Sequence, residues 1–210
     1  MELYEVIEKR RTIRDFSDKE VSTETLKRIL EAGMKAPSND HLRNIEFVVI
    51  KGRDTIAGVI KNIAENTKNI QMKWLDASKD TLDPSERDMF YDALPKQQKM
   101  LIESGCLVIP FFKQSECELL QPEDQSSLNY FASTWLAIEN ILLAATAEGL
   151  ACAIRIPIGD EAEHVRNQVN APGGWVMACF LAIGYAAENA VLPKQKPFNP
   201  EDKIHINVWK

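Results

Sequence analysis

Apolar residues recur at helical spacing in four stretches of the chain. The pattern predicts a first helix over residues 2–10, a second after the N-cap Ser22 that must stop before Pro37, and a short helix from Asp160 to Val169. The longest helix is expected over residues 126–148, about 35 Å at 1.5 Å per residue. Because it is apolar on every side, it should be buried on every side, which in so small a chain requires a second subunit.

Short apolar runs between these helices predict strands over residues 46–50, 106–112, 151–156 and 176–183. Residues 11–16 have no helical period and are expected to be extended. The charged stretch 55–104 is expected to be mostly helical, with interruptions near Pro84 and Pro95. It either covers a site or forms a solvated helical hairpin without a role, and the sequence leaves both open.

The sequence changes character beyond Tyr185. Three prolines, Pro193, Pro197 and Pro200, exclude a helix there, whereas Ile204 to Trp209 alternates like a strand. We therefore expect one domain over residues 1–210, in which residues 186–210 are an extended arm that reaches onto a neighbouring subunit.

Charge and composition exclude some partners. The net charge of −6 and pI near 5.2 provide no field that would attract nucleic acid or anionic lipid. No stretch is apolar and long enough for a membrane span, and the N-terminus does not resemble a signal peptide, so a cytoplasmic protein is expected. Of the four cysteines, three lie in apolar runs and are expected to be core residues: Cys106, Cys152 and Cys179. Cys117 does not lie in such a run.

Three arginines, Arg10, Arg11 and Arg14, lie within five residues and bracket the hydroxyl of Thr12. Guanidinium groups bind phosphate through paired charge-assisted hydrogen bonds, so this is a candidate phosphate site, although solvated arginines would give the same pattern. His164 has no acidic partners that suggest a metal site. No Gly-x-Gly-x-x-Gly or Walker-type loop is present, so no separate nucleotide-binding domain is expected.

Four motifs in order, Lys9-Arg10-Arg11-Thr12-Ile13-Arg14-Asp15-Phe16, Ala36-Pro37-Ser38, Glu148-Gly149-Leu150 and Ile183-Gly184-Tyr185, give the chain a resemblance to the FMN-dependent nitroreductase family. The resemblance implies an α+β nitroreductase-like fold, with a mixed or antiparallel central sheet flanked by helices and a C-terminal arm exchanged within a homodimer. It also implies hydride transfer from NAD(P)H through FMN to a small oxidised acceptor, such as a nitroaromatic or a quinone, by ping-pong kinetics. No catalytic side chain and no metal are implied.

The resemblance carries the cofactor-binding residues onto four segments. The phosphate end of FMN would meet Arg10, Arg11, Thr12 and the pair Lys194 and Lys196, with Arg14 near N1 of the flavin ring. The partner subunit would contribute a loop, and the segment after the third strand would supply backbone contacts to the ring. These two segments comprise Pro37, Ser38, Asn39 and His41, and Ile156, Pro157, Ile158 and Gly159.

The chain departs from the commoner family pattern at four places: His41 replaces asparagine, Arg43 replaces glutamine, Asn44-Ile45 replaces Pro-Trp, and Ile158 replaces an acidic residue. His41 either contacts FMN or lies free on the surface, and Arg43 either meets the substrate or pairs with Glu46. The departures leave two other functions open, namely a flavin sensor or carrier without turnover, and other flavin chemistry such as reductive dehalogenation or flavin destruction. The sequence does not choose between NADH and NADPH, or name the acceptor.

Overall fold

The computed structural model describes residues 2–63, 73–78, 80–114 and 124–209. The helices are α1 (Leu3–Lys9), α2 (Thr23–Met34), α3 (Arg53–Val59), α5 (Pro84–Ala93), α6 (Lys99–Glu103), α7 (Asn129–Ala147) and α8 (Glu161–Gln168). The strands are β1 (Ile45–Lys51), β2 (Cys106–Lys113), β3 (Ala151–Arg155), β4 (Trp175–Met177) and β5 (Phe180–Gly184). Residues 73–78 are also helical. The structure has four short 3₁₀ turns in its described residues: η1 (Asn39–His41), η2 (Leu94–Lys96), η3 (Ser126–Leu128) and η4 (Pro200–Asp202).

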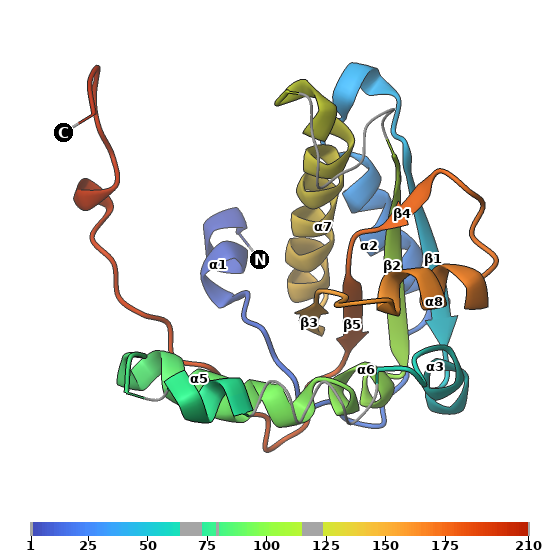
Figure 1. Ribbon diagram of the computed structural model, residues 1–210, viewed down its shortest axis with the longest axis horizontal. Coiled ribbons are helices and arrows are strands. Elements are labelled where there is room, and N and C mark those ends of the chain that lie inside the picture. Colours follow the sequence, from blue (N-terminus) through green and yellow to red (C-terminus); the bar gives the residue numbers. More distant parts are fainter. Residues whose placement is uncertain (1, 64–72, 79, 115–123, 210) are drawn as a thin grey trace.

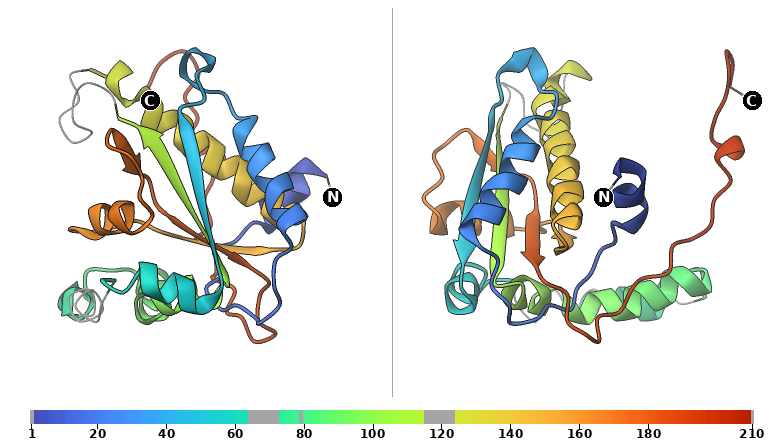
Figure 2. Two further views of the ribbon diagram at one scale, coloured as in Figure 1. Left: turned by 90° about the vertical axis from the view of Figure 1, so that its right-hand side faces the viewer. Right: turned by 180° about the vertical axis from the view of Figure 1, so that it is seen from behind.

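The strands form an antiparallel sheet in the order β1-β2-β5-β3, with β4 also paired to β2. Helices α2 and α7 cover one face, and α3, α6 and α8 lie on the other side (Figures 1 and 2). The fold class is therefore α+β, as predicted, with the antiparallel form of the expected sheet. Because both faces are covered, β2 is an almost uninterrupted apolar run with seven buried residues and only Lys113 exposed.

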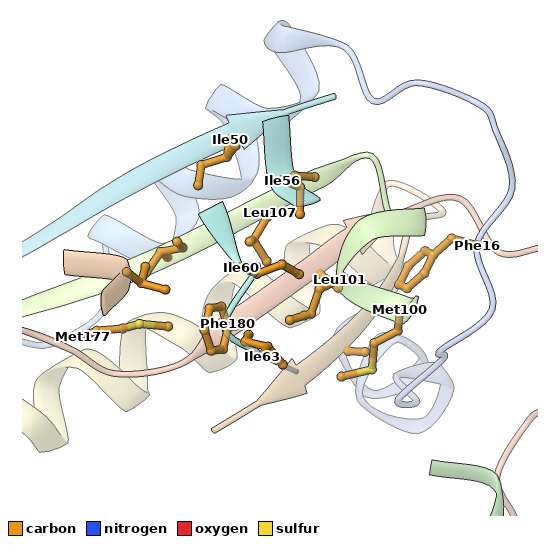
Figure 3. Close-up of a cluster of buried hydrophobic side chains, with 14 of the residues drawn as sticks. Phe16, Ile50, Ile56, Ile60, Ile63, Met100, Leu101, Leu107, Met177 and Phe180 are labelled. Carbon is orange, nitrogen blue, oxygen red and sulfur yellow. The ribbon is translucent and has the colours of Figure 1, made fainter. Parts of the chain in front are cut away.

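The core has one part on each face of the sheet. Between the sheet and α2 and α7, the side chains of Ile29, Ile138 and Ile141 pack on Val108 and Leu181. The opposite part, shown in Figure 3, includes Ile56, Met100, Leu101, Leu107 and Phe180. Cys106, Cys152 and Cys179 are buried in or beside these clusters, as the sequence predicted, whereas Cys117 lies outside the described residues.

The predicted strand 176–183 is wrong as a single element, because it is divided into β4 and β5. Met177 pairs with Phe111, but Leu181 pairs with Val108, so three residues of one strand face two of the other. The Ala178 N–H donates to the Pro110 carbonyl (2.9 Å) on that side. In an antiparallel strand, the N–H and C=O of one residue point toward the same neighbouring strand. Pro110 offers its carbonyl to that neighbour but has no N–H, so regular pairing fails there and a β-bulge forms.

Helix boundaries largely follow the predicted signals. Ser22 Oγ accepts the Thr25 N–H (3.1 Å) at the start of α2, and Asp83 caps α5. Asp160 occupies the N-cap position of α8, but its side chain makes no capping hydrogen bond. Pro95 interrupts the helical segment at η2, as expected. Among the described residues, no helix is both long and apolar enough to cross a membrane.

Within the single chain, residues Ile204–Trp209 form no strand, and their expected pairing with a neighbouring subunit stays a prediction. Residues 206–208 form a bend, in which Asn207 has a left-handed φ of 66°. The arm runs away from the sheet, beyond α1, so no strand edge lies beside it (Figures 1 and 2). An alternating sequence forms a strand only when another strand accepts its hydrogen bonds.

Candidate functional site

The segment after α1 is extended, as predicted, and runs beside the edge strand β3. Thr12 forms a parallel bridge with Cys152, and the Ile13 N–H donates to the Cys152 carbonyl (3.0 Å). Further along, Phe16 bridges to Ala186. These backbone contacts place the arginine-rich segment between the sheet and the beginning of the C-terminal arm.

A cavity of about 440 Å³ opens beside this segment. Six predicted cofactor residues line it: Arg10, Arg11, Thr12, Arg14, Lys194 and Lys196. Met89 of α5 and Phe198 of the arm add apolar surface. The fold therefore brings together five basic side chains from opposite ends of the sequence, and one hydroxyl.

Carboxylates surround this basic cluster but leave part of its charge unpaired. Arg10 Nε lies 3.3 Å from Glu139 Oε1, and Arg14 Nη1 lies 4.0 Å from Asp92 Oδ2. Lys196 forms ion pairs with Asp83, the N-cap of α5, and with Glu86 in its first turn. Only 13% of the Arg14 side chain is exposed, and its Nε has no hydrogen-bond partner within the described part of the chain.

An anionic ligand would complete the charge pairing and hydrogen bonding of Arg14. Burial lowers the pKa of Arg14, while Asp92 and Asp15 raise it, yet a guanidinium stays charged in proteins. A buried cation with an unused N–H favours an anion that accepts hydrogen bonds. The residues present therefore fit an anionic cofactor such as FMN: the basic cluster suits its phosphate, and Arg14 keeps an N–H for a further acceptor.

A second charged group ties α5 to the same segment. Lys96 Nζ lies 2.7 Å from Asp15 Oδ2 and 2.6 Å from Asp92 Oδ1. Partial burial opposes ionisation of both partners, but the hydrogen bond from Lys96 lowers the pKa of Asp15, and the two carboxylates raise the pKa of Lys96. The Val191 N–H also donates to Asp15 (3.3 Å). Helix α5 is thus held against the arginine segment and the arm as a wall of the cavity.

The predicted loop Pro37, Ser38, Asn39 and His41 does not line this cavity. The Asn39 N–H donates to Ser133 Oγ (3.0 Å) in the first turns of α7. Thr12, by contrast, pairs with Cys152, beyond the far end of a helix about 28 Å long. Within one chain the two groups of predicted residues are therefore separate.

The loop itself is held in an unusual backbone conformation. Asp40, His41 and Arg43 have φ values of 49°, 56° and 45°, in a region that non-glycine residues seldom adopt. Arg43 Nε donates to the Met34 carbonyl (3.4 Å), and none of the ion pairs found in the described residues joins it to Glu46. The pairing alternative predicted for Arg43 is therefore wrong.

A third predicted segment also lies outside the lining of the basic cavity: Ile156, Pro157, Ile158 and Gly159, which lead from the end of β3 into α8. Ile156 and Ile158 are 52% and 44% exposed, while Gly159 has a φ of 57°. Behind them lies a buried ion pair that the sequence analysis missed: Arg155 Nη1 and Nη2 lie 2.5 and 2.8 Å from the Glu161 carboxylate. The available signal was an arginine at the end of an apolar strand, followed six residues later by a glutamate.

The cysteines do not belong to this site. Burial raises the pKa of Cys106, Cys152 and Cys179 to about 12, so each remains a neutral thiol near pH 7. Cys152 contacts the arginine segment through its backbone, in the bridge to Thr12 and the hydrogen bond from Ile13.

Residues 7–185 match the model of the nitroreductase family, and the chain belongs to this family. A Methanothermobacter thermautotrophicus protein named "Putative NADH dehydrogenase/NAD(P)H nitroreductase" is 26% identical over all of this chain and 88% of its own length. An iodotyrosine deiodinase of Thermotoga neapolitana is 24% identical over 99% of this chain and 98% of its own. A solved iodotyrosine deiodinase, bound to FMN and 3-iodo-L-tyrosine, has a TM-score of 0.71 at 22% identity, covering 99% of this chain and all of that one. The family and the fold agree with the order of motifs in the sequence.

Proposed function

We propose that the chain is an FMN-dependent oxidoreductase that uses NAD(P)H to reduce a small oxidised acceptor, such as a nitroaromatic or a quinone. When bound, FMN supplies the hydride chemistry, accepting from the nicotinamide and then donating to the acceptor at the same place. No side chain of the chain is required as an acid or a base. The protein would bind the cofactor, orient it and set the charge around it.

The observation that carries this proposal is the basic cavity beside β3. Arg10, Lys194 and Lys196 would hold the phosphate with Arg11, while the Thr12 hydroxyl donates a further hydrogen bond. Arg14 would stand at the N1 side of the ring, where a fixed positive charge stabilises the negative charge gained on two-electron reduction. Met89 and Phe198 give the cavity an apolar side against which a flat ring can pack.

A homodimer would complete the site. Large apolar side chains are exposed on α1, at Leu3, Tyr4 and Ile7, and α7 exposes Leu136. The arm exposes seven more: Val191, Leu192, Phe198, Ile204, Ile206, Val208 and Trp209. Such a surface is typical of chains that bury it against a second subunit. The same partner would bring its Pro37–His41 loop to a flavin that this chain holds from the arginine side.

Anaerobic mixing of the FMN-loaded protein with NADH and, separately, with NADPH distinguishes an oxidoreductase from a flavin carrier. We expect at least one donor to bleach the flavin absorbance near neutral pH, and an added quinone or nitroaromatic to restore it. A flavin that stays oxidised with both donors, yet is reduced by dithionite, would identify a binder without turnover.

A second candidate function is reductive dehalogenation. It is favoured by the sequence matches to iodotyrosine deiodinases from several animals and a bacterium over most of this chain. The test is to reduce the bound flavin and then add either 3-iodo-L-tyrosine or a nitroaromatic in the absence of oxygen. Release of iodide at a rate above that of free reduced FMN would favour the dehalogenase. Reoxidation by the nitroaromatic alone would favour the nitroreductase.

A further inference from the structure

Arg155 and Glu161 form a closed, water-excluded ion pair across the loop that joins β3 to α8. Their side chains are only 2% and 4% exposed, and both nitrogens of the guanidinium fork meet the carboxylate. The Arg155 guanidinium also lies 5.5 Å from the centre of the Phe180 ring. The pair therefore spans a loop of five residues, 156–160, from the strand to the first turn of the helix.

Glu161 does more than neutralise the arginine, because Oε2 also accepts the Ile158 N–H (2.9 Å). The backbone of the loop adds a second tie, in which the Glu161 N–H donates to the Ile158 carbonyl (3.2 Å). Ile158 is thus held at both of its backbone polar groups by one residue. Its side chain is turned outward, where 44% of it is exposed.

A gain in folding stability does not explain why Arg155 and Glu161 are charged. Removing two ions from water is costly, and a buried ion pair is often no more stabilising than an apolar pair of similar volume. The surroundings are apolar, including Ala153, Val165 and Phe180, so aliphatic side chains would suit the same space. The feature that an aliphatic pair lacks is the acceptor for the Ile158 N–H.

We infer that Arg155 and Glu161 are positioning residues that fix the backbone of the 156–159 loop. The loop is not among the residues that line the basic cavity, and its place against the flavin ring is what the family resemblance implies. This inference rests on the proposed function. Arg155 orients the carboxylate, the carboxylate directs the Ile158 N–H into the protein, and the loop keeps one shape whether or not a ligand is present. A site with its shape set in advance loses less entropy on binding.

Two double variants separate the hydrogen bond from the charges. Arg155→Met/Glu161→Gln removes both charges but keeps an oxygen acceptor for the Ile158 N–H, whereas Arg155→Met/Glu161→Leu removes the acceptor as well. We expect both apoproteins to fold, with the Leu variant unfolding at a somewhat lower temperature because the Ile158 N–H loses its acceptor. The Leu variant should bind FMN about tenfold or more weakly than the Gln variant, because a loop without the Ile158 anchor must be ordered when FMN binds. Its bound flavin should also differ in visible absorbance, fluorescence quenching and midpoint potential.

A merely structural pair would change the unfolding temperature but leave the spectrum and potential of the bound flavin unchanged. If both doubles fold, and bind FMN with the same affinity, spectrum and potential, the inference is overturned. If the Leu variant does not fold, Glu161→Asp takes its place, since the shorter acid keeps the charge but withdraws from the Ile158 N–H. This variant should show the same tenfold loss relative to the wild type, and wild-type binding by it would overturn the inference. A wild-type protein that binds no FMN would overturn the proposed function, and the inference with it.

Discussion

Arg14 and Asp92 face each other at 4.0 Å between Nη1 and Oδ2, but Asp92 is also engaged by Lys96 at 2.6 Å. The carboxylate is therefore shared between two cations, and Arg14 is only partly neutralised. Because Arg14 is largely buried and its Nε is unpartnered in the described part of the chain, its charge remains available to a ligand. Helix α5, which carries Asp92, thus sets the electrostatics of the cavity as well as forming its wall.

The two assigned roles of the arginines predict different effects of their removal. Arg10→Ala should mainly weaken FMN retention, by the loss of a charge-assisted contact of about 1.5 to 3 kcal/mol, roughly ten- to hundredfold in Kd. Arg14→Ala should also lower the two-electron potential of the flavin. Fluorescence titration and anaerobic potentiometry measure the two effects. Equal losses of affinity with unchanged potentials would contradict the placement of Arg14 at the ring.

Asp92→Asn should change the potential in the opposite direction, because Arg14 then loses its nearest carboxylate and its positive charge acts more strongly on the flavin. We expect a rise of about 10 to 30 mV, equivalent to about 0.5 to 1.4 kcal/mol for a two-electron couple. Glu139→Gln is the matched control, since Glu139 lies beside Arg10 rather than Arg14. The control should alter FMN affinity and leave the potential unchanged. A potential that falls in the Asp92 variant would refute this reasoning.

The ion pair between Lys96 and Asp15 should make the contact between α5 and the arginine segment sensitive to acid. The pKa of Asp15 is below its ordinary value of 3.8, so its contribution to stability is present above that pH and is lost as the pH falls through the lower, folded-state value. Chemical unfolding at pH 7 and at about pH 3 should therefore show a smaller difference for Asp15→Asn than for the wild type. Identical pH dependence in the two proteins would show that the ion pair contributes nothing.

The buried cysteines predict low thiol reactivity. With pKa values near 12, Cys106, Cys152 and Cys179 should not react with a disulfide reagent at pH 8 in the native protein, and should all react after denaturation. Colorimetric titration of thiols, before and after adding guanidinium chloride, measures this. Rapid native labelling of any of these three cysteines, located by peptide mass spectrometry, would contradict their burial.

Shortening the C-terminal arm should impair dimerisation and flavin retention together. Truncation before Ile204 removes four exposed apolar side chains, Ile204, Ile206, Val208 and Trp209, while leaving Lys194 and Lys196 in place. We expect a shift toward monomer in sedimentation measurements, accompanied by loss of FMN and lower stability. The control is Lys203→Ala, since it alters the arm without removing apolar surface. A truncated chain that becomes monomeric yet stays fully loaded with FMN would refute the shared site.

Local sequence signals predicted much of the fold, and long-range contacts explain what they missed. Ser22, Pro37 and Pro95 define helix ends by local chemistry, so the helix boundaries could be predicted closely. The division into β4 and β5 depends on Pro110 of another strand, which no pattern within residues 175–184 reveals. The alternation at Ile204–Trp209 indicates the two faces of a strand but not its partner, so its pairing with a neighbouring subunit stays a prediction.

The candidate site shows the same division. Arg10, Arg11, Thr12 and Arg14 could be proposed from their spacing, but only the motif order connected them with Lys194 and Lys196, which now line the same cavity. Arg155 and Glu161 were overlooked because an arginine in an apolar strand and a glutamate in a short helix are unremarkable until the fold places them face to face. His41 and the rest of its loop remain proposed contacts for the partner's flavin.

The central claim is that the basic cavity holds FMN, and it is tested most directly by identifying the flavin released from the purified protein. The protein is reconstituted with a mixture of FMN, FAD and riboflavin, freed of unbound flavin, denatured and chromatographed. We predict FMN at about one molecule per chain, because the cavity presents basic side chains for one terminal phosphate and riboflavin offers none. Recovery of FAD or riboflavin in its place, or of no flavin at all, would contradict the account.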